Sequence, residues 1–255
     1  MTGLLRGNLA FVTGGGSGIG RAACQVLARE GAQVVAADRN LKSAEETIGT
    51  LQTSNSNGAS HHSSHLVDVS NFNSVKSSLN QILEKYKKPP SIVVNCAGIN
   101  RNNFILDMTE EEFDDVMNVN LKGTFLVIKI FAQAIIENKV PDASFVNIGS
   151  TVAKFGNITQ ANYGASKAGV ELVTKTVVKE FSKHGIRCNT ILPGVISTPM
   201  TNLVPAKDLE LVLPLIACER IGHAEEVAEV IAFLASSKSS YVNGAAIEVN
   251  GGWKA

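Results

Sequence analysis

Apolar stretches alternate with amphipathic stretches along the whole chain. The apolar stretches are short and rich in β-branched residues, which is typical of strands buried on both faces of a sheet. They are LAFVTG (9–14), AQVVAAD (32–38), SIVVNCAG (91–98), ASFVNIGS (143–150), IRCNTILPG (186–194) and AAIEVNGG (245–252). The amphipathic stretches predict helices, among them 19–31, 40–52 and 74–86. The alternation predicts an α/β fold, with a doubly wound parallel sheet flanked by helices on both faces, as one domain over residues 1–255.

Two segments interrupt this alternation. Gln52–His65 is polar and carries three histidines, but it offers no carboxylate partner and no helical spacing. It is therefore predicted to be a solvated loop, and no metal site is expected there. Gly194–Pro214 contains three prolines and is long for a connection between a strand and a helix. Such loops are often lids or binding loops.

Composition excludes several classes of protein. The formal net charge is zero, from 23 basic and 23 acidic residues, which argues against a nucleic-acid or anionic-membrane partner. We expect no membrane span, because no apolar run reaches the required length. The four cysteines are scattered without a CxxC pair, which indicates buried thiols in a reducing compartment. The amino-terminal segment has no long apolar signal region, so the sequence alone favours the cytoplasm.

A glycine-rich turn joins the first predicted strand to the first predicted helix. In VTGGGSGIGRAA, glycines stand at 14, 18 and 20. Glycines at this spacing let the backbone approach a pyrophosphate at a helix amino terminus, where free N–H groups and the helix dipole favour an anion. Because the turn lies between strand and helix near the start of the chain, it predicts a dinucleotide site.

The second predicted strand ends at Asp38. A carboxylate at this place can accept hydrogen bonds from the adenosine ribose and would repel a 2′-phosphate, which favours NAD over NADP. Ser17, which precedes Gly18, is not basic and does not offset this repulsion. Arg39 directly follows Asp38 and could pair with such a phosphate, so the sequence leaves some use of NADP open.

Tyr163 and Lys167 stand four residues apart in ANYGASKAG. On a helix they share one face, which brings an ammonium close to a phenol. A nearby cation favours phenolate and is expected to lower the pKa of Tyr163. The pair therefore predicts an acid/base tyrosine, although the same spacing also suits a half-buried Tyr beside a solvated Lys.

Seven motifs in order resemble those of the short-chain dehydrogenase/reductase family over essentially the whole chain. They are TGGGSGIG (13–20), DVS (68–70), NCAG (95–98), NVNLKGTF (118–125), NIGS (147–150), YGASK (163–167) and PGVISTPM (193–200). Cys96 departs from the family pattern, which usually has Asn. The resemblance implies a Rossmann-type fold, a nicotinamide cofactor and hydride transfer between a secondary alcohol and a ketone.

The resemblance also implies a catalytic tetrad of Asn120, Ser150, Tyr163 and Lys167. Tyr163 is the implied general acid/base, and Lys167 the implied holder of the nicotinamide ribose. Ser150 would hydrogen-bond the substrate oxygen, and Asn120 would fix a water for proton relay. The implied cofactor contacts are Gly14, Ser17, Gly18, Ile19, Gly20, Asp38, Arg39, Asp68, Val69, Asn95, Ala97, Gly98, Tyr163, Lys167, Pro193, Gly194, Ile196 and Thr198.

Within the family, the sequence is most similar to the branch of bacterial 3-oxoacyl-(acyl-carrier-protein) reductases and animal estradiol 17-beta-dehydrogenase 8. This implies acyl thioester substrates, with 17β-hydroxysteroids second, and a substrate pocket formed by 99–106, 152–158 and 194–214. Besides Ser150, its expected lining residues are Phe104, Phe155, Val195 and Met200.

The same branch implies an assembly and a compartment. A homotetramer is expected, or a heterotetramer with a carbonyl reductase 4-like subunit, paired through helices around 120–137 and 160–184. An acyl carrier protein could dock on nearby lysines, and the mitochondrial matrix is the implied compartment. A separate hypothesis makes the chain an NAD-binding structural or regulatory subunit of a heterotetrameric ketoacyl reductase, whose partner performs the turnover.

Overall fold

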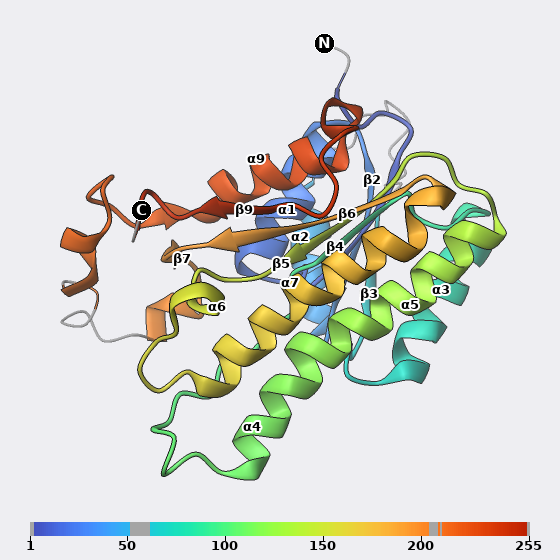
Figure 1. The fold of residues 1–255 in the computed structure, drawn as a ribbon. Coiled ribbons are helices and arrows are strands. Elements are labelled where there is room, and N and C mark those ends of the chain that lie inside the picture. The colour runs from blue at the N-terminus through green and yellow to red at the C-terminus, as the bar shows by residue number, and fades with distance from the viewer. Residues whose placement is uncertain (1–2, 52–61, 204–208, 210, 254–255) are drawn as a thin grey trace.

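A seven-stranded parallel sheet forms the centre of the molecule (Figure 1). The computed structural model describes residues 3–51, 62–203, 209 and 211–253. The strand order is β3-β2-β1-β4-β5-β6-β9, so the chain reverses its direction of winding between β1 and β4. The predicted α/β fold in one domain is confirmed. The strands of this sheet are β1 (Leu9–Thr13), β2 (Gln33–Asp38), β3 (Ser63–Leu66), β4 (Ile92–Asn95), β5 (Ala143–Ile148), β6 (Ile186–Pro193) and β9 (Ala246–Val249).

Helices cover both faces of the sheet, as Figure 1 shows. One layer contains α1, α2 and α9, and the other contains α3, α5 and α7. A short pair of strands, β7 (Ile196–Ser197) and β8 (Gly222–His223), lies outside the main sheet. The described α-helices are α1 (Gly18–Arg29), α2 (Leu41–Gly49), α3 (Phe72–Tyr86), α4 (Glu110–Val116), α5 (Thr124–Glu137), α6 (Val152–Phe155), α7 (Ala161–Phe181) and α9 (Ala224–Ala235).

The two cores follow from the alternation of side chains along each strand. Ala10 and Val12 of β1 belong to the core beneath α1 and α9. Leu9 and Phe11 belong to the core on the opposite face, where the Phe11 ring stacks on Phe131 of α5 with ring centroids 4.4 Å apart. Because both faces are buried, every residue of β1 is apolar except Thr13 at its carboxyl end.

One continuous helical segment runs through α4, a π-helical turn η1 (Met117–Gly123) and α5. By length and composition, Glu110–Glu137 could cross a membrane, so the expectation that no run reaches this length was wrong. Within the folded chain, 61% of its most apolar window is buried, as in the core helix of a globular domain. Single π-turns inside helices are frequent at functional sites, and this one contains Asn120.

The structure corrects two predictions made for polar residues. Part of the segment predicted to be a solvated loop forms β3, which sequence analysis missed because SSHL is short and not apolar; residues 52–61 lie outside the described part of the chain. His65 is only 6% exposed. Its Nδ1 lies 2.8 Å from the Ser78 hydroxyl, so the histidine is a hydrogen-bonded core residue. The predicted burial of all four cysteines also fails, because Cys218 is exposed.

Burial lowers the pKa of His65 from 6.5 to about 4, assisted by the nearby Lys85 charge. The unfolded chain therefore binds more protons than the folded chain between these two values, and stability is lost as the pH falls through this window. Between pH 7 and about pH 4.5, we expect His65 alone to remove about 2–3 kcal/mol from the free energy of unfolding.

Urea unfolding at both pH values measures this loss. His65→Gln should shrink the difference between the two pH values, because glutamine can bond Ser78 without titrating. Phe72→Ala, at the exposed start of α3, adds no titrating group and should leave the difference in place. An unchanged difference in His65→Gln would show that other groups cause the acid sensitivity.

Candidate active site

The glycine turn between β1 and α1 forms one wall of a cleft at the carboxyl edge of the sheet. Gly14 has φ +64°, and a Cβ there would lie 2.9 Å from the backbone of Ala97. Gly18 has φ +51° and approaches Thr198. Ser17, at the N-cap of α1, makes no side-chain capping bond. The first N–H groups of the helix therefore have no bond from a capping side chain. Backbone space and free donors at a helix amino terminus fit the pyrophosphate of a dinucleotide.

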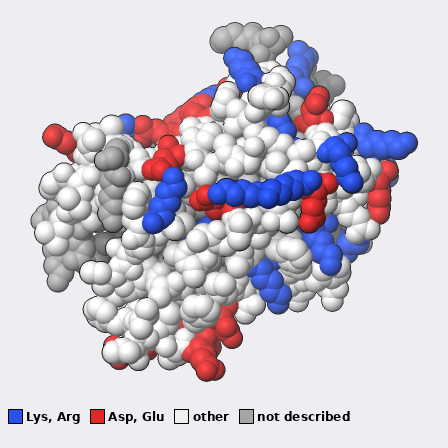
Figure 2. Space-filling view, in the orientation of Figure 1, with Lys and Arg blue, Asp and Glu red and all other residues white. Residues whose placement is uncertain are grey.

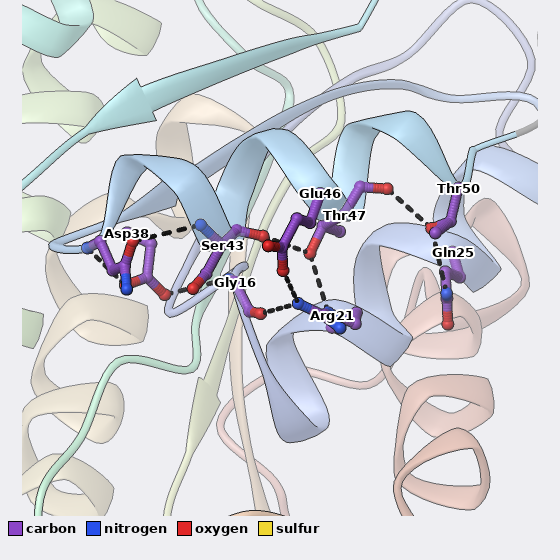
Figure 3. A network of polar contacts seen from close by, with 9 residues as sticks. Gly16, Arg21, Gln25, Asp38, Ser43, Glu46, Thr47 and Thr50 are labelled. Atoms are coloured by element: carbon purple, nitrogen blue, oxygen red, sulfur yellow. Dashed lines mark hydrogen bonds and ion pairs between the residues drawn. The ribbon is translucent and has the colours of Figure 1, made fainter.

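Figure 3 shows the polar network that holds this turn in place through Arg21 and Asp38. The Arg21 guanidinium donates to the carbonyl of Gly16 at 2.5 Å and to the Thr47 hydroxyl of α2 at 3.0 Å, and it pairs with Glu46 at 3.6 Å. On the other side, the Gly16 N–H donates to Oδ2 of Asp38 at 3.0 Å. The peptide groups of Gly16 are therefore held from both ends.

Asp38 has a structural role as well as a position suited to reading ribose. Its Oδ2 accepts from Gly16 and its Oδ1 accepts from the N–H of Asn40 at 2.9 Å. A carboxylate has about four acceptor positions, so both oxygens can still accept from ribose hydroxyls. Arg39 is exposed beside it and lines the same cleft.

The cleft has a volume of about 660 Å³. It brings together most of the residues that sequence analysis assigned to the cofactor and one assigned to the substrate. Those that line it are Gly14, Ser17, Gly18, Ile19, Gly20, Asp38, Arg39, Asp68, Val69, Ala97, Gly98, Tyr163, Lys167, Thr198 and Met200. This set fits an extended dinucleotide that runs from Asp38 to Tyr163.

Four predicted cofactor contacts are not part of this lining. The Asn95 amide is buried and donates to Oδ1 of Asn147 at 2.8 Å, so it links β4 to β5 inside the sheet. Pro193 and Gly194 bond neighbouring backbone through Thr151 and Val249. Ile196 belongs to the core beneath α1. Asp68 lines the cleft, but its Oδ1 also accepts from the N–H and hydroxyl of Ser70, as a turn aspartate does.

Tyr163 and Lys167 lie on one face of α7, as predicted. The Lys167 ammonium is 5.6 Å from the centroid of the Tyr163 ring, and it donates to the carbonyl of Ile148 at 2.8 Å. Lys167 is only 4% exposed. A Cβ on Gly98 would lie 3.5 Å from this ammonium, which is an ordinary contact, and 3.3 Å from Oδ1 of Asn120, which is a tight one.

The pKa of Tyr163 differs from the prediction. Burial raises the pKa of the Tyr163 phenol, and a hydrogen bond with Ser150 lowers it in part. Burial also lowers the pKa of Lys167 to about 8. The expected lowering of the pKa of Tyr163 by Lys167 is therefore wrong for the chain alone, because desolvation is the largest influence on the phenol and raises its pKa. At neutral pH, Tyr163 is a phenol with a proton to donate and Lys167 is charged.

Asn120 lies in the π-helical turn and is completely buried. Its Nδ2 donates to the carbonyl of Ile99 at 3.0 Å and to the Ser166 hydroxyl at 3.1 Å, and its Oδ1 accepts from the N–H of Ile99 at 2.8 Å. Ser166 in turn donates to the carbonyl of Tyr163 at 2.7 Å. Asn120 thus ties the segment after β4 to the helix that carries the tyrosine.

The predicted substrate pocket is only partly closed. Ser150 is buried and its hydroxyl bonds that of Tyr163, but Ser150 is not part of the lining of the cleft. Phe104, Phe155 and Met200 are 59%, 45% and 41% exposed. Val195 is partly buried next to β7. Residues 204–208 and 210 of the predicted lid lie outside the described residues.

Several cleft residues were not predicted. Arg101 and Asp115 form an ion pair of 3.4 Å at the cleft, and neither belongs to a recognised motif. Ile148 was part of the NIGS motif, but its backbone role toward Lys167 left no signal in the sequence. Among the residues that the structure describes, no group of His, Cys, Asp or Glu is placed to hold a metal ion.

Comparisons with known proteins agree with this geometry. Residues 14–254 match a family model described as enoyl-(acyl carrier protein) reductase. The human protein named (3R)-3-hydroxyacyl-CoA dehydrogenase is 46% identical over 97% of this chain and 96% of its own length. The 3-oxoacyl-(acyl-carrier-protein) reductase FabG of Thermotoga maritima is 40% identical over 97% of this chain and 98% of its own length.

A solved structure supports the same assignment. A putative 2-deoxy-d-gluconate 3-dehydrogenase of Agrobacterium tumefaciens with bound NADP superposes with a TM-score of 0.87 at 33% identity, over 98% of this chain and 97% of that one. Matching sequence over nearly the full length and the shared fold lead to one conclusion. The chain belongs to the short-chain dehydrogenase/reductase family and is an oxidoreductase of the kind that acts on CH–OH groups.

Proposed function

We propose that this enzyme interconverts 3-oxoacyl and 3-hydroxyacyl thioesters with NAD(H) as its cofactor. The observation that carries the proposal is the pairing of the buried Lys167 with the partly buried Tyr163, whose phenol also bonds Ser150, at the end of the cleft. The names of the human and Thermotoga relatives support the thioester class. A 17β-hydroxysteroid is the second candidate substrate, because the sequence also resembles enzymes of that kind.

The side chains divide the reaction among themselves. A bound reduced nicotinamide supplies the hydride for the carbonyl carbon. Tyr163 donates its phenolic proton to the carbonyl oxygen, so that a ketone gains one hydride and one proton. Ser150 hydrogen-bonds the same oxygen and stabilises its developing charge. Lys167 stabilises the phenolate that remains. Asn120 holds the backbone that borders the path along which a proton from solvent reaches the phenolate.

A turnover screen tests the reaction and the substrate class. We expect 3-oxoacyl thioesters to be reduced with a higher kcat/KM than 17-ketosteroids. Tyr163→Phe should lower kcat by about three orders of magnitude, since a general acid contributes about 10²–10⁴-fold. NADH binding, followed by fluorescence, should survive because the ring and its packing remain.

Tyr241→Phe is the matched control, because Tyr241 is fully exposed and should keep full activity. Near-normal turnover by Tyr163→Phe would refute the acid/base role. Preference for steroids would replace the thioester assignment but leave the mechanism intact. Activity that is absent from the purified chain and restored only by a partner would favour the structural or regulatory subunit.

The choice of NAD rests on Asp38. Its charge would lie a few ångströms from a 2′-phosphate, which costs about 1–4 kcal/mol at dielectrics between water and a protein surface. Loss of ribose hydrogen bonds, at about 0.5–1.5 kcal/mol each, adds to this cost. Arg39 offsets part of this electrostatic cost by pairing with the phosphate. We therefore expect NAD(H) to be favoured over NADP(H) by about tenfold to a thousandfold in kcat/KM.

Asp38→Ser should narrow or invert this ratio. Asp38 also accepts a hydrogen bond from Gly16, and the variant loses this support of the glycine turn. It should therefore bind both cofactors more weakly than loss of the carboxylate charge alone would predict. Asp68→Ser is the control, since it removes a carboxylate from the same cleft but should leave the ratio unchanged. Equal use of both cofactors by the unmodified protein would show that Arg39 governs the choice.

A tetramer is the proposed assembly. Helices α5 and α7 border an apolar groove of about 650 Å³ lined by Phe125, Ile128, Val173 and Phe181, among others. Phe125 is 46% exposed there. An apolar face of this kind is suited to the paired helices of an oligomer, whether the partner is a second copy or a carbonyl reductase 4-like subunit.

We expect the purified chain to sediment as a homotetramer at micromolar concentration. Phe125→Asp should dissociate it, because a charge would be buried in the contact. Phe72→Asp is a matched control, since Phe72 has the same exposed fraction of 46% but lies at the start of α3. A monomeric unmodified chain would contradict this assembly.

The carrier-protein hypothesis has weaker support. Figure 2 shows charges of both signs interspersed over the visible face. Of the lysines proposed for docking, Lys175 pairs with Glu171 at 2.9 Å and Lys129 lines the groove assigned to the tetramer. Lys139 and Lys179 remain exposed at the far end of α5 and on α7. The proposed compartment is the mitochondrial matrix, on the family resemblance alone, with the cytoplasm as the alternative.

A further inference from the structure

We propose that Asn162 is a positioning residue that fixes the substrate-side loop (residues 99–109) against the helix that carries Tyr163. Asn162 directly precedes the tyrosine and none of the roles described above uses it. It is completely buried, although asparagine is a residue type that is usually exposed. The inference rests on the proposed function only for the identity of the substrate.

The Asn162 side-chain amide forms hydrogen bonds with three different elements. Nδ2 donates to the carbonyl of Arg101 at 2.9 Å and to the carbonyl of Glu112 at 3.1 Å. Oδ1 accepts from the N–H of Tyr163 at 2.7 Å. One side chain therefore joins the substrate-side loop, α4 and the first turn of α7.

Asn162 also satisfies a donor that the helix leaves open. Gln160, at the N-cap of α7, makes no side-chain capping bond. The first N–H groups of a helix have no intrahelical partner, and Asn162 accepts one of them, that of Tyr163. The position of the catalytic residue at the start of α7 is thus coupled to the position of the loop.

The substrate-side loop is held at two points close to the reacting groups. Asn120 binds both backbone groups of Ile99, and Asn162 binds the carbonyl of Arg101 two residues later. Farther along the loop, the N–H of Asn103 donates to the carbonyl of Thr159 at 3.0 Å. The contacts at Ile99 and Arg101 use completely buried side chains, whereas the side-chain bonds near Asn103, to Glu112 at 3.2 Å and from Gln160 to Asn102 at 3.2 Å, are more exposed.

The loop held in this way carries the apolar residues expected to receive the acyl chain. Phe104, Ile105 and Leu106 are 59%, 74% and 95% exposed. Phe104 and Ile105 border a groove of about 530 Å³ whose other wall includes Val152 and Ile158. Exposed apolar side chains on an irregular loop have little packing to hold them, so their placement depends on the backbone contacts made by Asn162.

Two substitutions separate the functions of the amide. Asn162→Asp keeps the acceptor for the Tyr163 N–H but loses both donated bonds. At about pH 8 we expect it to raise KM for a 3-oxoacyl thioester about tenfold or more, with less than about threefold change in kcat. Buried against two carbonyl oxygens, the new carboxyl would have a raised pKa. KM should therefore recover toward about pH 6, where the protonated acid can donate again to one carbonyl.

Asn162→Ala removes all three bonds and should raise KM without this recovery. The Kd of NADH should change less than about twofold in either variant, because Asn162 is not itself part of the lining of the cofactor cleft. Asn138→Asp is the matched control. The Asn138 amide also donates to a carbonyl, that of Ala134 at 2.9 Å, but it lies at the far end of α5. It should leave KM and its pH dependence unchanged.

Hydrogen exchange gives a readout that needs no substrate. The amides of residues 99–109 should exchange faster in Asn162→Ala than in the unmodified protein and in Asn138→Ala. If the unmodified enzyme reduces no thioester, the proposed function fails, and this exchange measurement still decides the role of Asn162. Unchanged exchange in the loop, or equal losses for thioester turnover and NADH binding, would overturn the proposal.

Discussion

The buried ammonium of Lys167 is the feature on which the arrangement of the site depends. It is almost inaccessible to solvent and donates to one carbonyl, that of Ile148, so the charged form is disfavoured and its pKa falls to about 8. That cost is relieved when negative charge develops on the Tyr163 phenol beside it. The ionised form of each group is therefore disfavoured in the resting chain. In the proposed reaction the two charges would stabilise each other as the proton leaves Tyr163, which favours the transition state over the ground state.

This balance requires α7 to keep one register against the sheet. Thr174, buried two turns after Lys167, accepts from the Asn147 amide of β5 at 2.9 Å and from the Thr190 hydroxyl of β6 at 2.8 Å. Asn147 in turn accepts from Asn95 of β4. A chain of buried polar groups thus crosses three strands beneath the catalytic helix. Buried polar groups are costly when unpaired, and in this network only Oδ1 of Asn95 lacks a partner among the described residues. The directional bonds to Thr174 therefore favour one register of α7 on an otherwise apolar surface.

The sequence predicts the parts of this structure that repeat or that depend on local chemistry. Unbroken apolar strands and the glycine turn are sufficient for the sheet, its two helical layers and the cleft, and the spacing of Tyr163 and Lys167 places both on one face. Long-range balances are not visible in the same way. The pKa of Tyr163 depends on how far folding buries it, β3 is too polar to be recognised, and Asn95 faces Asn147 because of strand order. The side-chain contacts of Arg21 and Asn162 join residues tens of positions apart in the sequence, so no local sequence pattern predicts them.

The two ends of the cleft use charge in opposite ways. At one end, Asp38 is partly exposed and accepts hydrogen bonds from the glycine turn and from Asn40, so backbone donors hold its carboxylate in a fixed position. At the catalytic end, Lys167 is desolvated and its charge is marginal. In the proposed function, Asp38 discriminates among ligands, which requires a charge that is fixed before the reaction begins. Lys167 acts in the reaction itself, which requires a charge that becomes better stabilised as the reaction proceeds. The parallel sheet supplies both, because β2 ends at the glycine turn near solvent while β5 ends beneath α7, where Ile148 and Ser150 are covered.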